Sequence, residues 1–166
     1  MFMSRGTPVV YYGDEQGFAG DGGDQDARQD MFASRVASYN DDRLVGSSAT
    51  TAQANFNRDS TLYRAIAGMA ALRRDDPAIS RGDQIVRASG DKPGLFAISR
   101  LAPTGGGETL IAFNTGTTPV SANIVVGGGS GRWTSVRGRC AAEAAAPGSY
   151  RVEVPALDYI VCRTMR

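Results

Sequence analysis

Histidine is absent from the 166-residue sequence, which excludes histidine-based catalytic triads and histidine metal sites. Long apolar runs are also missing, so no stretch is long enough to cross a membrane. The first three residues, Met-Phe-Met, are too short for the apolar core of a signal peptide. Eighteen Lys and Arg residues are scattered along the chain against 17 Asp and Glu. The resulting net charge of +1 gives no reason to expect nucleic acid as a partner.

The most informative stretch is residues 6–18, with the sequence GTPVVYYGDEQGF. Its apolar run from Pro8 to Tyr12 does not alternate, which predicts a short strand covered on both faces, as in a parallel sheet. The run stops at Gly13 and is followed by two adjacent carboxylates, Asp14 and Glu15. Polar groups at the C-terminal end of such a strand are where a β/α barrel keeps its chemistry.

This stretch resembles the eighth and last barrel strand of the alpha-amylase superfamily of glycoside hydrolases, together with the loop that follows it. Residues 72–82, LRRDDPAISRG, resemble the way the family leaves its last barrel helix, and the segments GLFAISR and ETLIAFNTG resemble its C-terminal sandwich. A complete β/α barrel needs about 250 residues, so the resemblance implies a fragment. We interpret Met1 as an internal position, and the lack of a signal peptide then says nothing about where the parent protein resides.

Between the predicted strand and the sandwich, the sequence predicts a long loop and one helix. Residues 19–59 are polar, rich in Gly, Asp, Ser, Thr and Asn, and show no sustained period, and a loop of that length is usually functional or disordered. Helical periodicity then runs from Thr61 to about Arg74, with Ser60 as the expected N-cap. Pro77 is expected to stop this helix.

From Asp83 onward, short segments with period-two alternation are separated by clusters rich in Gly and Pro, which predicts an antiparallel β-sandwich. The fold class is therefore α+β: the remnant of a β/α (TIM) barrel, with one strand, a long loop and one helix, followed by an all-β sandwich. We expect the boundary near Gly82, between an incomplete barrel end at 1–82 and a sandwich domain at 83–166. The expected strands are Gln84–Ser89, Leu95–Leu101, Glu108–Asn114, Pro119–Val126, Arg132–Val136, Tyr150–Val154 and Leu157–Arg163. The expected sandwich core consists of Phe96, Ile98, Ile111, Phe113, Ile124, Val126, Trp133, Val152 and Ile160.

The acidic loop GDGGDQDARQDMF carries the candidate binding site. Asp24, Arg28 and Met31 resemble a family motif in which Asp is followed four positions later by Arg and three further on by Met. The resemblance implies that Asp24 and Arg28 are substrate-binding residues, which contact hydroxyls of a glucosyl unit near the cleavage point. A carboxylate and a guanidinium offer fixed acceptors and donors for paired hydroxyls. Many relatives have Trp where this chain has Phe32.

Other interpretations of the acidic residues stay open at this point. Asp14 and Glu15 resemble a glycosidase carboxylate pair only superficially, because adjacent residues at a strand end point in different directions. We expect them to shape the loop by hydrogen bonding. No cofactor is predicted; the alternative is a calcium site, since hard oxygens suit that ion, although the spacing does not fit an EF-hand. The acidic side chains concerned are Asp21, Asp24, Asp26 and Asp30. A solvated loop with Arg28 and Arg35 as counter-ions is the third interpretation.

The only two cysteines, Cys140 and Cys162, both lie in the predicted sandwich. A disulfide would stabilise an exported parent by about 3 kcal/mol, whereas in a cytosolic parent Cys162 would be a small buried residue and Cys140 a free thiol. We favour the bridge, and with it an extracellular or periplasmic location over a cytoplasmic one. Trp133, a lone tryptophan in a predicted strand, is expected in the core rather than on a sugar-binding surface.

For function, the resemblance implies retaining hydrolysis or transglycosylation of α-glucosidic bonds in starch, maltooligosaccharides or related glucosides. The family's Asp nucleophile, Glu acid/base and second Asp belong to earlier barrel strands, and no residue here matches any of them. The catalytic set within this chain is therefore none, and the chain alone is expected to be inactive. Its partner is an α-glucan or oligosaccharide bound by the complete enzyme, with neither nucleic acid nor membrane involved. The alternative function is a carbohydrate-binding or purely structural β-sandwich domain.

Overall fold

The computed structural model describes residues 1–105 and 107–165. The chain forms two compact units, one of Met1–Thr7 with Leu72–Arg166 and the other of Pro8–Ala71. This packing division differs from the predicted boundary near Gly82, because the chain already joins the sandwich unit at Leu72. The assignment of 1–82 and 83–166 to two domains of a parent enzyme stays a prediction. Within the described ranges, no helix is both long enough and apolar enough to cross a membrane.

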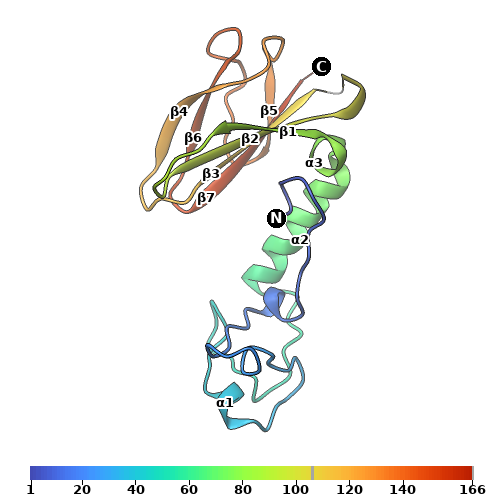
Figure 1. Cartoon of the computed structure of the whole chain (residues 1–166), viewed down its shortest axis with the longest axis vertical. Helices are drawn as coiled ribbons and strands as arrows, with labels where there is room; N and C mark the ends of the chain where they lie inside the picture. The colour runs from blue at the N-terminus through green and yellow to red at the C-terminus, as the bar shows by residue number, and fades with distance from the viewer. Residues whose placement is uncertain (106, 166) are drawn as a thin grey trace. The chain divides into compact units, whose positions relative to one another are not determined.

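The larger unit is an antiparallel β-sandwich, as predicted. One sheet has five strands in the order β1-β2-β3-β7-β5, and the second pairs β4 with β6 (Figure 1). Every strand pair is antiparallel, and the observed strand ends lie within about two residues of those expected from period-two alternation. The strands are β1 (Asp83–Ala88), β2 (Leu95–Leu101), β3 (Glu108–Asn114), β4 (Val120–Val125), β5 (Trp133–Arg137), β6 (Ser149–Val154) and β7 (Asp158–Thr164).

The sandwich core lies between the two sheets and is partly different from the one expected. Ile124, Val126, Trp133, Val152 and Ile160 belong to it as predicted. The correction concerns β2 and β3, where the core residues are small or medium-sized instead of the four large residues expected. Those actually in the core are Ala97, Leu110 and Ala112, and those excluded from it are Phe96, Ile98, Ile111 and Phe113.

Two large aromatic side chains share the core with these smaller residues. Trp133 and Tyr150 pack ring to ring with centroids 4.3 Å apart, and both are at most 2% exposed. Ala97 and Ala112 belong to the same buried cluster, and small side chains there are compatible with two large rings because protein interiors are close-packed. Trp133 is thus a core residue, as predicted, and its indole N–H donates to the Ser130 carbonyl at 2.8 Å.

The opposite face of the five-stranded sheet is also partly buried. Ile98 and Ile111 are fully buried there, beside the short helix α3 (Pro77–Arg81), whose Ile79 is fully buried as well. Pro77 therefore begins a helix after the expected break, since proline is favoured at the first helical position. Asp76 caps this helix by accepting the backbone N–H of Ala78 at 2.8 Å.

The predicted long helix is present as α2 (Thr61–Asp75). The Ser60 hydroxyl accepts the backbone N–H of Tyr63 at 3.0 Å, which confirms Ser60 as the N-cap. The helix ends one residue later than expected and has no buried residue of its own. Its stability in this chain therefore depends more on its cap and on Ala-rich propensity than on burial.

The smaller unit departs most from expectation, because the strand predicted at Pro8–Tyr12 is not formed. These residues make no ladder within the described parts of the chain, and Val9 is 74% exposed. A strand needs a neighbour for its N–H and C=O groups, and none of the strands that the structure describes pairs with this segment. Apart from the part of α2 that precedes Leu72, the unit's regular structure consists of a 3-10 helix η1 (Asp14–Gln16) and a short helix α1 (Ala37–Asn40). Most of residues 19–59 form loops, as expected.

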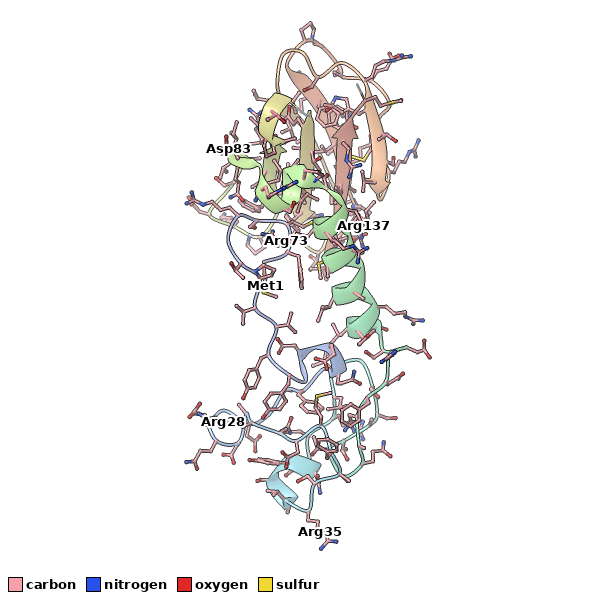
Figure 2. The ribbon with its side chains drawn as sticks, turned by 90° about the vertical axis from the view of Figure 1, so that its right-hand side faces the viewer. Met1, Arg28, Arg35, Arg73, Asp83 and Arg137 are labelled. Atoms are coloured by element: carbon pink, nitrogen blue, oxygen red, sulfur yellow. A yellow bond between two sulfur atoms is a disulfide. The ribbon has the colours of Figure 1, made fainter. Side chains whose placement is uncertain are left out.

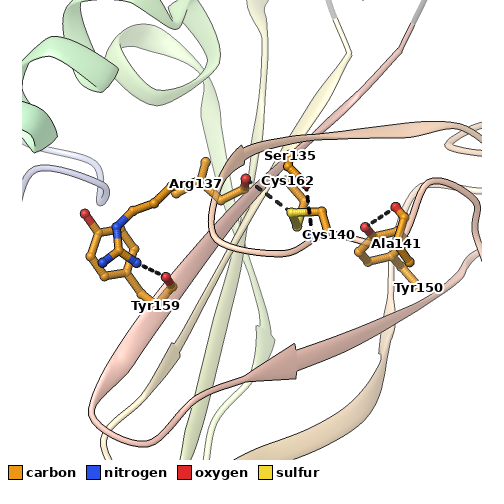
Figure 3. Close-up of a disulfide and its surroundings, with 8 residues drawn as sticks. Ser135, Arg137, Cys140, Ala141, Tyr150, Tyr159 and Cys162 are labelled. Carbon is orange, nitrogen blue, oxygen red and sulfur yellow. Dashed lines mark hydrogen bonds between the residues drawn. A yellow bond between two sulfur atoms is a disulfide. The ribbon is translucent and has the colours of Figure 1, made fainter.

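The two cysteines form a disulfide (Figure 3). Cys140 lies in the loop after β5, where its backbone N–H donates to the Ser135 hydroxyl at 3.0 Å, and Cys162 is a fully buried residue of β7. The bridge fastens the loop to the sandwich core across a sequence separation of 22 residues.

Candidate functional site

The two carboxylates that follow the expected strand are engaged with their own turn. Asp14 accepts the backbone N–H of Tyr11 at 3.0 Å, and Glu15 accepts that of Gly13 at 3.1 Å. The backbone of Gly13 has a φ of 92°, a conformation that glycine adopts without strain. Asp14 and Glu15 therefore shape the entry to the loop by hydrogen bonding, as expected.

Asp24 and Arg28 lie next to each other on the acidic loop. Their side chains form an ion pair with 2.7 Å between the carboxylate and guanidinium atoms, and both are well exposed, at 81% and 59%. A tight turn makes this possible, since the backbone N–H of Ala27 donates to the Gly23 carbonyl at 3.0 Å and that of Arg28 to the Gln25 carbonyl at 3.1 Å. The structure thus brings together the two residues that the sequence singled out. Arg28 projects outward from a loop different from that of Arg35 (Figure 2).

An exposed aromatic pair lies on the same unit. Phe32 and Phe56 meet edge to face with ring centroids 5.1 Å apart, and they are 72% and 53% exposed. The backbone N–H of Asn55 donates to the Met31 carbonyl at 2.7 Å and fixes the two segments side by side. Phe56 was not identified from the sequence, because nothing in a loop pattern connects it to a residue 24 positions earlier.

Buried polar residues, rather than an apolar core, hold this loop unit together. The side-chain amide of Gln29, 1% exposed, donates to the Tyr39 carbonyl and to Asp42, both at 3.1 Å. The hydroxyl of Thr51, fully buried, donates to the same Tyr39 carbonyl at 2.6 Å. Asn55 bonds to two further carbonyls. Such a scaffold has no hydrophobic period, which is why the sequence showed only an unstructured loop.

The acidic cluster expected as an alternative calcium site is not the one the structure forms. Within the described residues, carboxylate oxygens of Asp21, Asp41 and Asp42 lie within 4.8 Å of one another, whereas Asp24 is paired with Arg28. Repulsion, chiefly from Asp42, raises the pKa of Asp21. Three largely exposed carboxylates fall short of the six to eight oxygens, roughly, that calcium takes.

A row of aromatic side chains crosses the outer face of the five-stranded sheet. Phe96, Phe113 and Tyr159 occupy paired positions on neighbouring strands, and their rings stack with centroids 6.2 and 5.5 Å apart. The guanidinium of Arg137 covers the Tyr159 ring at 3.7 Å (Figure 3). Burial raises the pKa of Tyr159. The three side chains are half-buried and stack on one another, whereas a sugar ring needs an open aromatic face to stack on.

Comparison with known proteins gives these features a context. No family model matches the chain. An alpha-amylase of Streptomyces lividans is 43% identical over 164 residues, which make up 98% of this chain and 18% of that protein. The chain therefore spans less than a fifth of the length of this curated relative.

Solved structures share the fold over nearly the whole chain. An alpha-amylase from H. orenii matches 99% of this chain and 33% of its own, with a TM-score of 0.66 and 20% identity. An alpha-amylase from Anoxybacillus matches 99% and 31%, with a TM-score of 0.64 and 21% identity. A cyclomaltodextrin glucanotransferase gives a TM-score of 0.63 at 18% identity. At these identities the likeness concerns the fold alone.

The fold of the chain is thus that of one part of alpha-amylase structures. Together with the sequence relative, this defines the class: the chain belongs to the alpha-amylase family and corresponds to a C-terminal part of such an enzyme. The resemblance that the sequence motifs indicated is confirmed.

Proposed function

We propose that the chain supplies the last barrel elements and the sandwich of an enzyme that hydrolyses or transfers α-glucosidic bonds with retention. Starch, maltooligosaccharides or related glucosides are the proposed substrates. The observation that carries the proposal is the 43% identity to a curated alpha-amylase along nearly the whole chain. The nucleophile and the acid/base come from other parts of the parent enzyme, so the role of this chain is to bind substrate and to stabilise the barrel.

Within this function, Asp24 and Arg28 contact hydroxyls of a glucosyl unit. Their ion pair at 2.7 Å places acceptor oxygens and donor N–H groups side by side, which matches the donor and acceptor pattern of neighbouring sugar hydroxyls. Both side chains are exposed, so a sugar reaches them without any rearrangement of the loop. Phe32, with its ring 72% exposed on the same unit, supplies an apolar surface for the C–H face of a sugar.

The alternative of a carbohydrate-binding sandwich has no observation in its favour. Trp133 is 2% exposed, and Phe96, Phe113 and Tyr159 are half-buried and stacked on one another. The proposal assigns no cofactor. Calcium binding at Asp21, Asp41 and Asp42 is a separate hypothesis, tested by titrating the chain with Ca²⁺ alone and following heat.

A chimera tests the site directly. In it, this chain replaces the matching 164-residue stretch of the Streptomyces lividans alpha-amylase. Arg28→Ala and Asp24→Ala should each lower kcat/KM on maltooligosaccharides by about 10- to 100-fold, the loss expected when charge-assisted hydrogen bonds in the transition state are removed.

Arg35→Ala is the matched control, since Arg35 is exposed on the same unit and belongs to no ion pair within residues 1–105 and 107–165. It should leave kcat/KM unchanged. If all three variants have the kinetics of the unsubstituted chimera, Asp24 and Arg28 do not contact the sugar.

A further inference from the structure

One side chain, Arg73, binds backbone carbonyls from two places in the chain, the N-terminal segment and α3. It lies in the last turn of α2, and its Nη1 donates to the carbonyls of Phe2 at 2.8 Å, Ser4 at 2.9 Å and Ile79 at 3.4 Å. Its Nη2 donates to the carbonyl of Gly6 at 2.5 Å. We call this guanidinium and its four carbonyls the Arg73 clamp. All five residues belong to the sandwich unit, and Figure 2 shows Arg73 beside the segment that begins at Met1.

The charge of Arg73 is compensated by dipoles instead of a carboxylate. No ion pair of the described residues includes it, whereas its neighbour Arg74 is exposed and bonds only to Asp75. The carbonyl end of a helix favours a cation, and four further carbonyls strengthen that preference. A guanidinium bound in this way holds backbone in place, because each acceptor belongs to the main chain.

The N-terminal segment has few other polar attachments. Two amides are engaged: Ser4 donates to the Met1 carbonyl at 3.3 Å, and Arg5 donates to the side chain of Gln84 at 2.8 Å. The side chains of Phe2 and Met3 are buried, at 7% and 1% exposed.

Carbonyls of alternate residues, 2, 4 and 6, converge on one guanidinium because the segment turns around it. Gly6 has a φ of 101°, which a residue with a Cβ adopts only with strain, although no atom lies within 4 Å of where that Cβ would be.

We propose that Arg73 is a positioning residue. The Arg73 clamp holds residues 1–7 on the sandwich unit and thereby fixes the point from which residues 8–12 lead into the loop that carries Asp24 and Arg28. The role in positioning the Asp24–Arg28 loop rests on the proposed function, whereas the attachment of residues 1–7 to the sandwich unit does not. Lysine cannot replace arginine here, because a compact ammonium with three donors cannot reproduce the planar fork that reaches carbonyls on two sides.

Hydrogen exchange on the 166-residue chain tests the clamp without any need for catalysis. In Arg73→Met, the amides of Ser4 and Arg5 should exchange at least about tenfold faster, since local opening controls their protection. Arg73→Lys should not restore them, and Arg74→Met, which removes an exposed arginine one position further on, should leave them unchanged. The amides of β3 serve as the internal reference for an intact sandwich.

If Arg73→Met also loosens β3, Gly6→Ala provides the second variant, because it strains only the segment and blocks no neighbour. It should accelerate the same two amides while β3 stays protected. Unchanged exchange in both variants, or equal acceleration by Arg74→Met, would overturn the proposal.

The functional half is tested in the chimera by a double-mutant cycle. Arg73→Met should lower kcat/KM, and it should lower it no further once Arg28→Ala is present, because both changes remove the same sugar contact. Losses that simply multiply would overturn the positioning role. If Arg28→Ala alone has no effect, the proposed sugar contact fails, while the exchange result still decides whether the clamp exists.

Discussion

At the scale of single residues, Asp76 connects α3 to the sheet. It is 3% exposed and accepts hydrogen bonds from the backbone of Ala78, from the hydroxyl of Thr109 at 2.8 Å and from Arg163 at 2.9 Å. Each donor would lose its partner if the carboxylate were removed. The preceding residue, Asp75, is exposed and pairs only with Arg74.

We therefore predict that Asp76→Ala lowers the free energy of unfolding by about 3 kcal/mol, because buried donors are left without acceptors. Asp75→Ala should change it by less than about 0.5 kcal/mol, as surface pairs do. Urea unfolding followed by the fluorescence of Trp133, the only tryptophan, measures both. Equal effects of the two substitutions would show that Asp76 has no special role.

Tyr150 makes the sandwich sensitive to alkali. Burial raises the pKa of Tyr150 to about 12, against 10.0 for the free side chain, and its hydroxyl donates to the Ala141 carbonyl at 2.6 Å. Because the folded state keeps the proton longer than the unfolded state, this stabilisation is complete below pH 10 and is lost as the pH rises toward 12.

Between pH 9 and pH 11 the loss from this one group should be about 1.4 kcal/mol. The comparison is with Tyr150→Phe, which cannot ionise at that position. Its unfolding free energy starts lower, since a hydrogen bond is missing, but should fall by about 1.4 kcal/mol less over the same pH range. An identical fall in both proteins would contradict the assignment.

At the scale of elements, the disulfide stabilises the region between β5 and β7. It closes a loop of 22 residues, and in the chain-entropy model such a loop corresponds to about 3 kcal/mol. Cys140→Ser combined with Cys162→Ser should lower the unfolding free energy by about that amount, as measured with urea under oxidising conditions. Reduction of the unsubstituted chain should reproduce the loss. A variant as stable as the parent chain would show that the bridge constrains nothing.

The strands were predictable because their signals are local. Alternation and glycine-rich turns placed β2 and β3 at their observed ends. Which face of each strand points into the core could not be predicted from local signals. On β2, the face with Phe96 and Ile98 carries two large apolar side chains, yet it is Ala97 that lies in the core with Trp133 and Tyr150 from other strands.

The segment Pro8–Tyr12 shows the opposite case, in which a strong local signal had no structural outcome. Its apolar run is typical of a barrel strand, but pairing is a property of two segments, and no segment within residues 1–105 and 107–165 forms a ladder with it. The side chains of Val9 and Tyr11 are 74% and 52% exposed as a result.

The candidate site also has one part that the sequence predicted and one part that it did not. The Asp24–Arg28 pair was recognisable from a motif. The placement of Phe56 beside Phe32 was not recognisable, because it depends on the buried polar residues Gln29, Thr51 and Asn55, whose spacing in the sequence shows no period.

At the scale of the whole molecule, the central claim is that this chain works as a C-terminal part of an alpha-amylase-type enzyme. It predicts that the isolated chain has no turnover on starch, because a set of catalytic groups that act together is not replaced by binding residues. It also predicts that the chain completes a barrel whose remaining strands come from a relative.

The most direct measurement is therefore starch hydrolysis by the unsubstituted chimera with the Streptomyces lividans alpha-amylase, compared with that enzyme itself and with the same enzyme lacking the exchanged stretch. The account predicts kcat/KM within about tenfold of the natural enzyme, since the exchanged stretches are 43% identical over 164 residues. The shortened enzyme should be inactive. A chimera that unfolds cooperatively on heating, and so is folded, yet hydrolyses no starch would contradict the account.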